Sequence, residues 1–286
     1  MKAIYLGLVS VLLLATAPLS AQTNQPIQEL KANAEKGNAE AQLRLGLRYY
    51  GGLDVTNDNA EAVKWIRKAA EQSYPDAEYF LGFFYESGIG MAEDQIEAMK
   101  WYRKAAEHGF ALAQYNLGVC YKIGQGLPTN YVEAVKWYRK AAEQGYANAQ
   151  FNLGNCYYVG QGIMQNYTEA LKWYRKAANQ GDGEAQYNLG LSYVKGLGVT
   201  QNDLEAYFWF NLAAAQGIKQ AASLRDAEAS RLSREEISER QRRAAAFVPK
   251  NEMPVSSSDN SASPLKSYRR RFNYLTFAAS CANLLA

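Results

Sequence analysis

The sequence has very little histidine and cysteine and almost no net charge. One histidine and three cysteines occur in 286 residues, too few for a disulfide-dense scaffold or for a zinc site built from several histidines. The 31 lysines and arginines nearly balance the 28 aspartates and glutamates, leaving a net charge of +3, whereas a dedicated nucleic-acid binder carries a strong basic excess. We therefore expect no metal, no cofactor and no nucleic-acid partner.

Long apolar runs are also missing, except at the N-terminus. There Lys2 precedes an apolar run from Ile4 to Ala17, and Pro18 and a small-residue stretch follow. This order is typical of a secretory signal peptide, which we expect to be cleaved after Ala21. An uncleaved anchor is the alternative, but the run is shorter than the ~20 residues that span a bilayer. The mature chain is thus expected to be secreted or periplasmic, with no stable membrane insertion.

The rest of the chain is organised by a repeat, the feature to seek first in any sequence. Five tryptophans are each 36 residues apart, and Leu-Gly and Ala-Ala pairs recur at the same interval. The tryptophans are Trp65, Trp101, Trp137, Trp173 and Trp209. Five units in register predict a repeat protein.

Each unit is predicted to form two helices, here called helix A and helix B. In helix A, Ala149, Leu153 and Tyr157 are spaced by four and share one face, while Gly154 beside Leu153 suggests that another element passes too close for a side chain. A glycine-containing turn ends helix A. Phosphate binding by this turn is disfavoured, because a dinucleotide site needs a preceding strand and a third glycine.

Helix B begins with a capping signal and carries the tryptophan. The cap residues, each followed three positions later by glutamate, are Asp58, Asp94, Asn130, Asn166 and Asn202. We expect the cap side chain to accept backbone N–H groups and the glutamate to reach back to the cap. Trp137, Tyr138 and the alanines at 134 and 141 form the apolar face, and the five tryptophans are expected to occupy equivalent buried sites.

One such hairpin cannot bury both of its apolar faces, but a stack of neighbours can. The predicted fold is therefore all-α, a right-handed superhelical α/α solenoid with a 36-residue period. We assign residues 1–21 to the signal peptide and 26–217 to five repeats preceded by a partial helix. Residues 218–248 are assigned to C-terminal capping helices, and 249–286 to a disordered Ser/Pro-rich tail with a short basic and apolar end.

These motifs closely resemble the Sel-one-like repeat (SLR) family, which is related to the tetratricopeptide repeats. The third unit follows the family pattern almost throughout, with Ala113, Leu117-Gly118, Tyr121, Asn130 and Trp137-Tyr138. The resemblance implies a secreted bacterial protein that is not an enzyme. It would bind a protein or peptide partner, in envelope function or host contact. Some cysteine-rich relatives bind or hydrolyse β-lactams, but they carry a cysteine pair in each repeat, unlike this chain.

A β-lactam hydrolase is the alternative function, and two short motifs bear on it. Ser192-Tyr193-Val194-Lys195 matches S-x-x-K, and Ser258-Asp259-Asn260 matches S-D-N. The third motif of that class, K-T-G, does not occur in the sequence. We therefore interpret both matches as accidental.

Cys120 and Cys156 occupy the same position of adjacent units. Neighbouring helices lie too far apart for a disulfide between them, so we expect none.

By analogy with tetratricopeptide proteins, helix A should line a concave groove that takes an extended peptide or a partner helix. The groove positions are the third, seventh and tenth residues of helix A, counted from its alanine. In units two to five the predicted groove residues are Tyr79, Phe83, Glu86, Tyr115, Val119, Lys122, Phe151, Asn155, Tyr158, Tyr187 and Leu191. The third positions, here called the first column, are nearly all aromatic. For these residues a second interpretation stays open, because a stripe of aromatic residues at helical spacing also suits the core between repeats.

Overall fold

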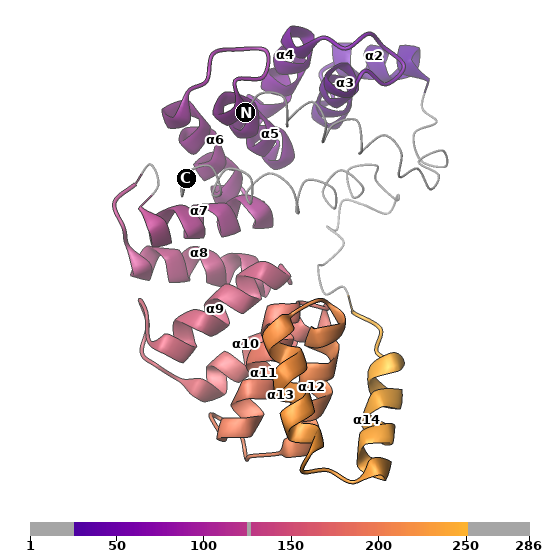
Figure 1. Ribbon diagram of the computed structural model, residues 1–286. Helices are drawn as coiled ribbons and strands as arrows, with labels where there is room; N and C mark the ends of the chain where they lie inside the picture. The colour runs from indigo at the N-terminus through magenta and orange to yellow at the C-terminus, as the bar shows by residue number, and fades with distance from the viewer. Residues whose placement is uncertain (1–25, 125–126, 251–286) are drawn as a thin grey trace.

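The computed structural model describes residues 26–124 and 127–250, and in these ranges every regular element is a helix. The helices follow one another along a curved path from α2 to α14 (Figure 1). Each helix packs on the one before and the one after it, from α2 to α13. The predicted all-α solenoid is confirmed.

Five helix pairs form the repeats. The first helices of the pairs, which correspond to helix A, are α3 (Ala39–Gly51), α5 (Pro75–Ser87), α7 (Ala111–Ile123), α9 (Ala147–Val159) and α11 (Gly183–Lys195). The second helices, which correspond to helix B, are α4 (Asn59–Ala70), α6 (Gln95–Glu107), α8 (Tyr131–Glu143), α10 (Tyr167–Asn179) and α12 (Asp203–Ala215). Before them lies α2 (Ile27–Glu35), and after them α13 (Lys219–Ala229) and α14 (Arg234–Ala245).

The predicted caps of helix B are confirmed, but the role of the following glutamate is wrong. All five Asp or Asn side chains accept a backbone N–H in the first turn. Glu133 does not reach back to its cap; instead it accepts a hydrogen bond from Lys136 at 2.5 Å, and Glu61, Glu97 and Glu169 pair with a lysine in the same way. A lysine one turn later attracts the carboxylate toward solvent. The one reciprocal capping box of the described residues joins Ser233 and Glu236 on α14.

The glycine in the middle of helix A makes room for a ring from helix B. A Cβ on Gly118 would lie 2.7 Å from two ring carbons of Tyr138 on α8, and Tyr138 is completely buried. The same contact between a helix A glycine and a helix B tyrosine ring recurs at Gly82 with Tyr102 and at Gly154 with Tyr174. The close approach inferred from the sequence is confirmed, and the aromatic side chain after the tryptophan is the partner.

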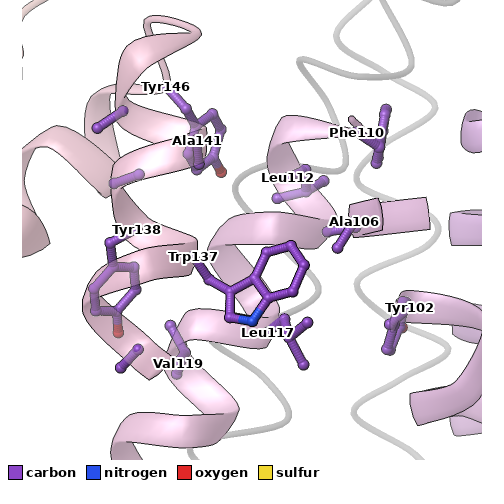
Figure 2. Close-up of a cluster of buried hydrophobic side chains, with 14 of the residues drawn as sticks. Tyr102, Ala106, Phe110, Leu112, Leu117, Val119, Trp137, Tyr138, Ala141 and Tyr146 are labelled. Atoms are coloured by element: carbon purple, nitrogen blue, oxygen red, sulfur yellow. The ribbon is translucent and has the colours of Figure 1, made fainter. Parts of the chain in front are cut away.

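The tryptophans themselves occupy equivalent sites that differ in burial. Trp137, Trp173 and Trp209 are buried, whereas Trp65 and Trp101 are half-buried. In the first four repeats a lysine ammonium lies 3.9–4.3 Å from the ring centroid of the tryptophan, so one face of each indole borders the solvent side. Figure 2 shows Trp137 and Tyr138 leaving α8 in different directions. Full burial of all five indoles was therefore wrong for the first two repeats.

Two rows of polar contacts hold the helices together, one between neighbouring repeats and one within each repeat. In the first row an arginine of helix B donates to a tyrosine hydroxyl 18 residues later, as Arg139 does to Tyr157 at 2.8 Å. In the second row a glutamine at the end of helix B donates to a glutamine 30 residues earlier on helix A of the same repeat, as Gln144 does to Gln114 at 2.8 Å. The equivalent pairs are Arg67–Tyr85, Arg103–Tyr121, Arg175–Tyr193, Gln72–Gln42, Gln180–Gln150 and Gln216–Gln186. The helix A glutamine also donates to a backbone carbonyl of the preceding helix B, as Gln114 does to Ala106 at 3.0 Å, so both rows contribute to the packing of neighbouring repeats.

The second repeat replaces the glutamine pair by an ionisable pair. Glu78 and His108 stand at the two glutamine positions, and the Glu78 carboxylate lies 2.8 Å from His108 Nδ1. The Glu78 side chain is 1% exposed and that of His108 is 42% exposed. The exposed histidine therefore has a structural role as the partner of a buried carboxyl group.

At the C-terminal end, α14 packs on the outer face of α12. Phe208, which stands where the other repeats have an exposed lysine, is 2% exposed, and Arg243 lies 4.0 Å from its ring centroid. Arg243 and Arg240 both pair with Glu205, at 2.6 and 3.2 Å. The helix thus covers an aromatic face that α12 alone among the second helices presents.

Asp182 supplies a pH test of the fold, because it caps α11 in a desolvated position. Its carboxylate accepts from Ala185 N–H at 2.8 Å, but burial raises the pKa of the carboxyl group. A raised folded-state pKa gives stability that is present below the unfolded pKa and is lost as the pH rises through the folded pKa.

Asp182→Asn should therefore be more stable than the wild type at pH 7. Asparagine caps as well as aspartate, as Asn38 does for α3, and it avoids burying a charge. The advantage should shrink below about pH 4, where aspartate is protonated. Urea unfolding of both proteins at pH 7 and at pH 3.5–4 measures it. If Asp182→Asn raises the free energy of unfolding by the same amount at both pH values, the buried charge of Asp182 is not the cause.

None of the helices in residues 26–250 is both long and apolar enough to cross a membrane. The predicted signal peptide, the S-D-N match at 258–260, Cys281 and the tail from residue 251 onward lie outside the described residues.

Candidate partner-binding surface

The first predicted column packs on the buried ring of its own repeat. Tyr79 is 3% exposed and its ring centroid lies 5.3 Å from that of Tyr102. Tyr115, Phe151 and Tyr187 are half-buried, and each has its centroid 6.0 Å from the ring that lies against the helix A glycine. Tyr79 therefore belongs to the core, and the other three present only one edge outward.

The seventh and tenth positions vary in both chemistry and exposure. Val119 is buried at 9% exposure, within the cluster drawn in Figure 2. The remaining predicted residues at these positions are half-buried: Phe83, Glu86, Lys122, Asn155, Tyr158 and Leu191. Their side chains are thus held by neighbours on one side and are open on the other, which suits contact with a partner.

Hydrogen bonds position the polar members of this set. The Glu86 carboxylate accepts from the Tyr102 hydroxyl at 2.7 Å, and Asn155 Oδ1 accepts from the Tyr174 hydroxyl at 2.6 Å. Both donors are the buried tyrosines of helix B, so the core fixes the orientation of the surface group. Tyr158 is held by an edge contact with Tyr167, with 5.3 Å between the ring centroids.

A column of asparagines at the fourth position of helix A was missed from the sequence. Asn116, Asn152 and Asn188 are 36 residues apart, and Asn188 donates from Nδ2 to Asn155 Oδ1 at 3.4 Å. Asn116 is 4% exposed, and its Oδ1 has no hydrogen-bond partner among the described residues. The sequence did contain a signal for this column, because asparagine recurs at a fixed interval between the third and seventh positions of helix A, which were both predicted to line the groove.

The ionisable groups near this surface show no sign of chemical activation. Burial raises the pKa of the phenols of Tyr102, Tyr138 and Tyr174. Burial also raises the pKa of the Cys156 thiol, and nearby Lys122 opposes this only in part. A thiol with a raised pKa is a poor nucleophile. Cys120 and Cys156 are both buried and neither is in a disulfide, so the prediction that they form no disulfide is confirmed.

The S-x-x-K match lacks the geometry of a nucleophile and its base. Ser192 is 2% exposed, and its hydroxyl donates to the Asn188 carbonyl at 2.8 Å, within α11. Lys195 is exposed at the end of the same helix. No group of three or more His, Cys, Asp or Glu side chains in the described part of the chain could hold a metal ion.

The fold and this surface define a class of protein, the α-solenoids built from repeated helical hairpins. A family model for the Sel1 repeat matches residues 39–74, 75–110, 111–146, 147–182 and 183–218. These matches cover more than half of the chain, so the chain belongs to the Sel1 repeat family. Proteins of this family typically serve as scaffolds for protein–protein interaction.

Known relatives share the repeats over part of their length. The chain is 43% identical to c5321, described as a protective antigen present in uropathogenic Escherichia coli strains displaying an SLR fold; the TM-score is 0.65 over 69% of this chain and 42% of that chain. A Sel1 repeat protein from Oxalobacter formigenes is 36% identical, with a TM-score of 0.61 over 70% of this chain and 80% of that one.

A curated relative is similar over a shorter stretch. The secretory immunoglobulin A-binding protein EsiB of E. coli O6:H1 is 43% identical over 69 residues, which is 24% of this chain and 14% of that protein. The chain therefore matches 14% of the length of EsiB and 42% of that of c5321.

Proposed function

We propose that this chain is an exported interaction scaffold, without catalytic activity, that binds an extended peptide or a protein partner on helices α5, α7, α9 and α11. The observation that carries the proposal is the contrast between two sets of positions. The packing residues repeat from unit to unit, whereas the residues at the seventh and tenth positions of helix A all differ among units two to five, and all but Val119 are half-buried.

Residues that vary on a fixed frame suit recognition of one particular partner. The frame is stiffened by the arginine–tyrosine row between repeats and by the glutamine row within each repeat, so the surface needs little reorganisation on binding. Its centre combines aromatic side chains with the amide of Asn155 and the ammonium of Lys122. Aromatic groups supply contact area, and oriented polar groups supply specificity.

Export is proposed from the N-terminal segment, with cleavage after Ala21. The β-lactam alternative is not favoured, because Ser192 is buried and its hydroxyl is engaged with a backbone carbonyl. A labelled β-lactam incubated with the purified chain tests this alternative, and stable acylation of the protein would overturn the proposal of a non-enzymatic scaffold.

The proposed surface is tested with the double variant Lys122→Ala/Tyr158→Ala. The processed wild-type chain is used to capture partners from envelope and host material, with secretory immunoglobulin A as one defined ligand because EsiB is named for binding it. The variant should bind a captured partner at least about tenfold more weakly. Its melting temperature should fall by no more than about 2–4 °C, since both side chains are only half-buried.

Lys172→Ala is the matched control, because it removes a positive charge from the outer face of α10, where the side chain is 62% exposed. It should bind as the wild type does. If the double variant binds the partner with wild-type affinity, the partner does not bind on these helices.

A further inference from the structure

The exposed large apolar side chains gather on one edge of the solenoid. This edge, here called the turn edge, is formed where each helix A ends and the next helix B begins. The strongly exposed residues on it are Ile96, Ile123, Val132, Val159 and Met164, with exposures of 72, 52, 53, 65 and 87%. Among the described residues Val248 is the one other large apolar side chain above 50% exposure, and it lies beyond α14.

The fold does not require apolar residues at these positions. The last residue of helix A is Ile123 or Val159 in repeats three and four but Ser87 or Lys195 in repeats two and five. The second residue of helix B is Ile96 or Val132 but Thr168 in repeat four. Isolated exposed apolar residues are ordinary, whereas a group confined to one edge marks an interaction surface.

The turn edge is continuous from one repeat to the next. The turn of repeat four lies against the start of α8, where a Cβ on Gly162 would be 2.3 Å from the Tyr131 carbonyl oxygen. Met164 follows in this turn and Val132 follows Tyr131, so repeats three and four share one apolar area. Tyr131 itself is 40% exposed.

The charges that flank this area differ at its two ends. Repeat two contributes Glu93 and the cap Asp94, both exposed, and repeat five contributes the exposed Lys195 together with the half-buried Asp203 at the start of α12. A two-fold axis between repeats three and four would place repeat three opposite repeat four of a second molecule, and repeat two opposite repeat five. Apolar residues would then meet apolar residues, and Glu93 would face Lys195 of the other copy.

We propose that the turn edge is the interface of a homodimer in which two solenoids pair antiparallel. A closed two-fold contact uses the same patch on both subunits, which must therefore be self-complementary in this way. An anionic lipid surface fits less well, because Glu93, Asp94 and Glu97 lie beside Ile96 and would be repelled. The proposal does not rest on the partner-binding surface of helix A.

The association is tested on the full processed chain by sedimentation equilibrium. The wild type should have about twice the mass of one chain at about 100 µM, and Val132→Asp/Met164→Asp should be monomeric, with a dissociation constant raised at least about 100-fold. Both residues are exposed, so helical content should be unchanged, and melting should match the wild type at a dilution where both proteins are monomeric. Val248→Asp is the matched control and should remain dimeric.

The antiparallel arrangement is tested by charge exchange. Glu93→Lys and Lys195→Glu should each weaken the dimer at low salt, and the two together should restore it, because the facing pair is inverted. A wild-type monomer at about 100 µM overturns the proposal, including a monomer that cosediments with phosphatidylglycerol vesicles. It is also overturned if Val132→Asp/Met164→Asp remains dimeric. The same holds if Glu93→Lys and Lys195→Glu together do not restore the dimer affinity that each change alone reduces.

Discussion

Replacing Tyr138 with alanine should lower the free energy of unfolding by about 3–5 kcal/mol, the range measured for truncating buried aromatic residues. The ring is completely buried in the middle of the array, and it fills the space beside Gly118 on α7. It also contacts Tyr115, with 6.0 Å between the ring centroids. Its removal therefore leaves a cavity between the two helices of repeat three.

Urea unfolding followed by circular dichroism measures this change. In an array stabilised by nearest-neighbour contacts, a weakened central repeat uncouples the two halves. We therefore expect a broader or split transition as well as a lower midpoint. A loss below about 1 kcal/mol, the size of a typical surface effect, would mean that the ring does not carry the packing of this repeat.

Tyr138→Phe is the matched control, because it keeps the ring and removes only the hydroxyl. Burial raises the pKa of this phenol, and its buried oxygen has no hydrogen-bond partner among the described residues. Repeat five has Phe210 against Gly190 at the same place. The change should therefore cost less than about 1 kcal/mol, whereas Tyr174→Phe should cost about that much by losing its hydrogen bond to Asn155.

The local signals of the repeat were sufficient to predict its helices. Asn130 in front of an alanine and tryptophan pattern predicted the start of α8, and Gly124 predicted the end of α7; both are observed. These features depend on backbone hydrogen bonds within a few residues, so each can be read from a short window. A fixed period then strengthens each prediction, because one interpretation must hold for five copies.

Contacts between helices were harder to predict, because they join residues distant in sequence. Gln114 and Gln144 also recur with the period, yet nothing in the sequence of the repeat shows that these two glutamines will face each other. The substitution of Glu78 and His108 for such a pair was a better signal, since two unusual residues occur 30 positions apart. The burial of Trp101 could not be predicted from its own repeat, because that ring packs against the preceding one.

The candidate site was predicted in outline and not in detail. Counting positions along helix A placed Asn155 and Tyr158 on the open side of α9. The same count selected Val119, which is buried within the hydrophobic cluster of the central repeats. It overlooked Asn116, which is 4% exposed and belongs to a column that faces the preceding repeat, as the contact of Asn188 with Asn155 shows.

Gly162→Ala should destabilise the array by roughly 3 kcal/mol or more, the sum of a left-handed backbone penalty and a steric clash. The residue has φ of +74°, and an added Cβ would lie 2.3 Å from the Tyr131 carbonyl oxygen and 2.4 Å from its carbon. Both are backbone atoms at the start of α8, so the neighbouring repeat has no flexible side chain that could move away.

Gly109→Ala separates the two contributions to this effect. Gly109 has φ of +93°, with no atom within 4 Å of the added Cβ, so the change should cost only the backbone penalty of about 1–2 kcal/mol. Ser73 occupies the equivalent place after α4 with φ of +59°, which shows that this turn accepts a side chain. Thermal unfolding of both variants gives the difference, which should be at least about 1 kcal/mol. Equal losses would mean that the turn of repeat four does not press on α8, and that the two repeats meet through their helices alone.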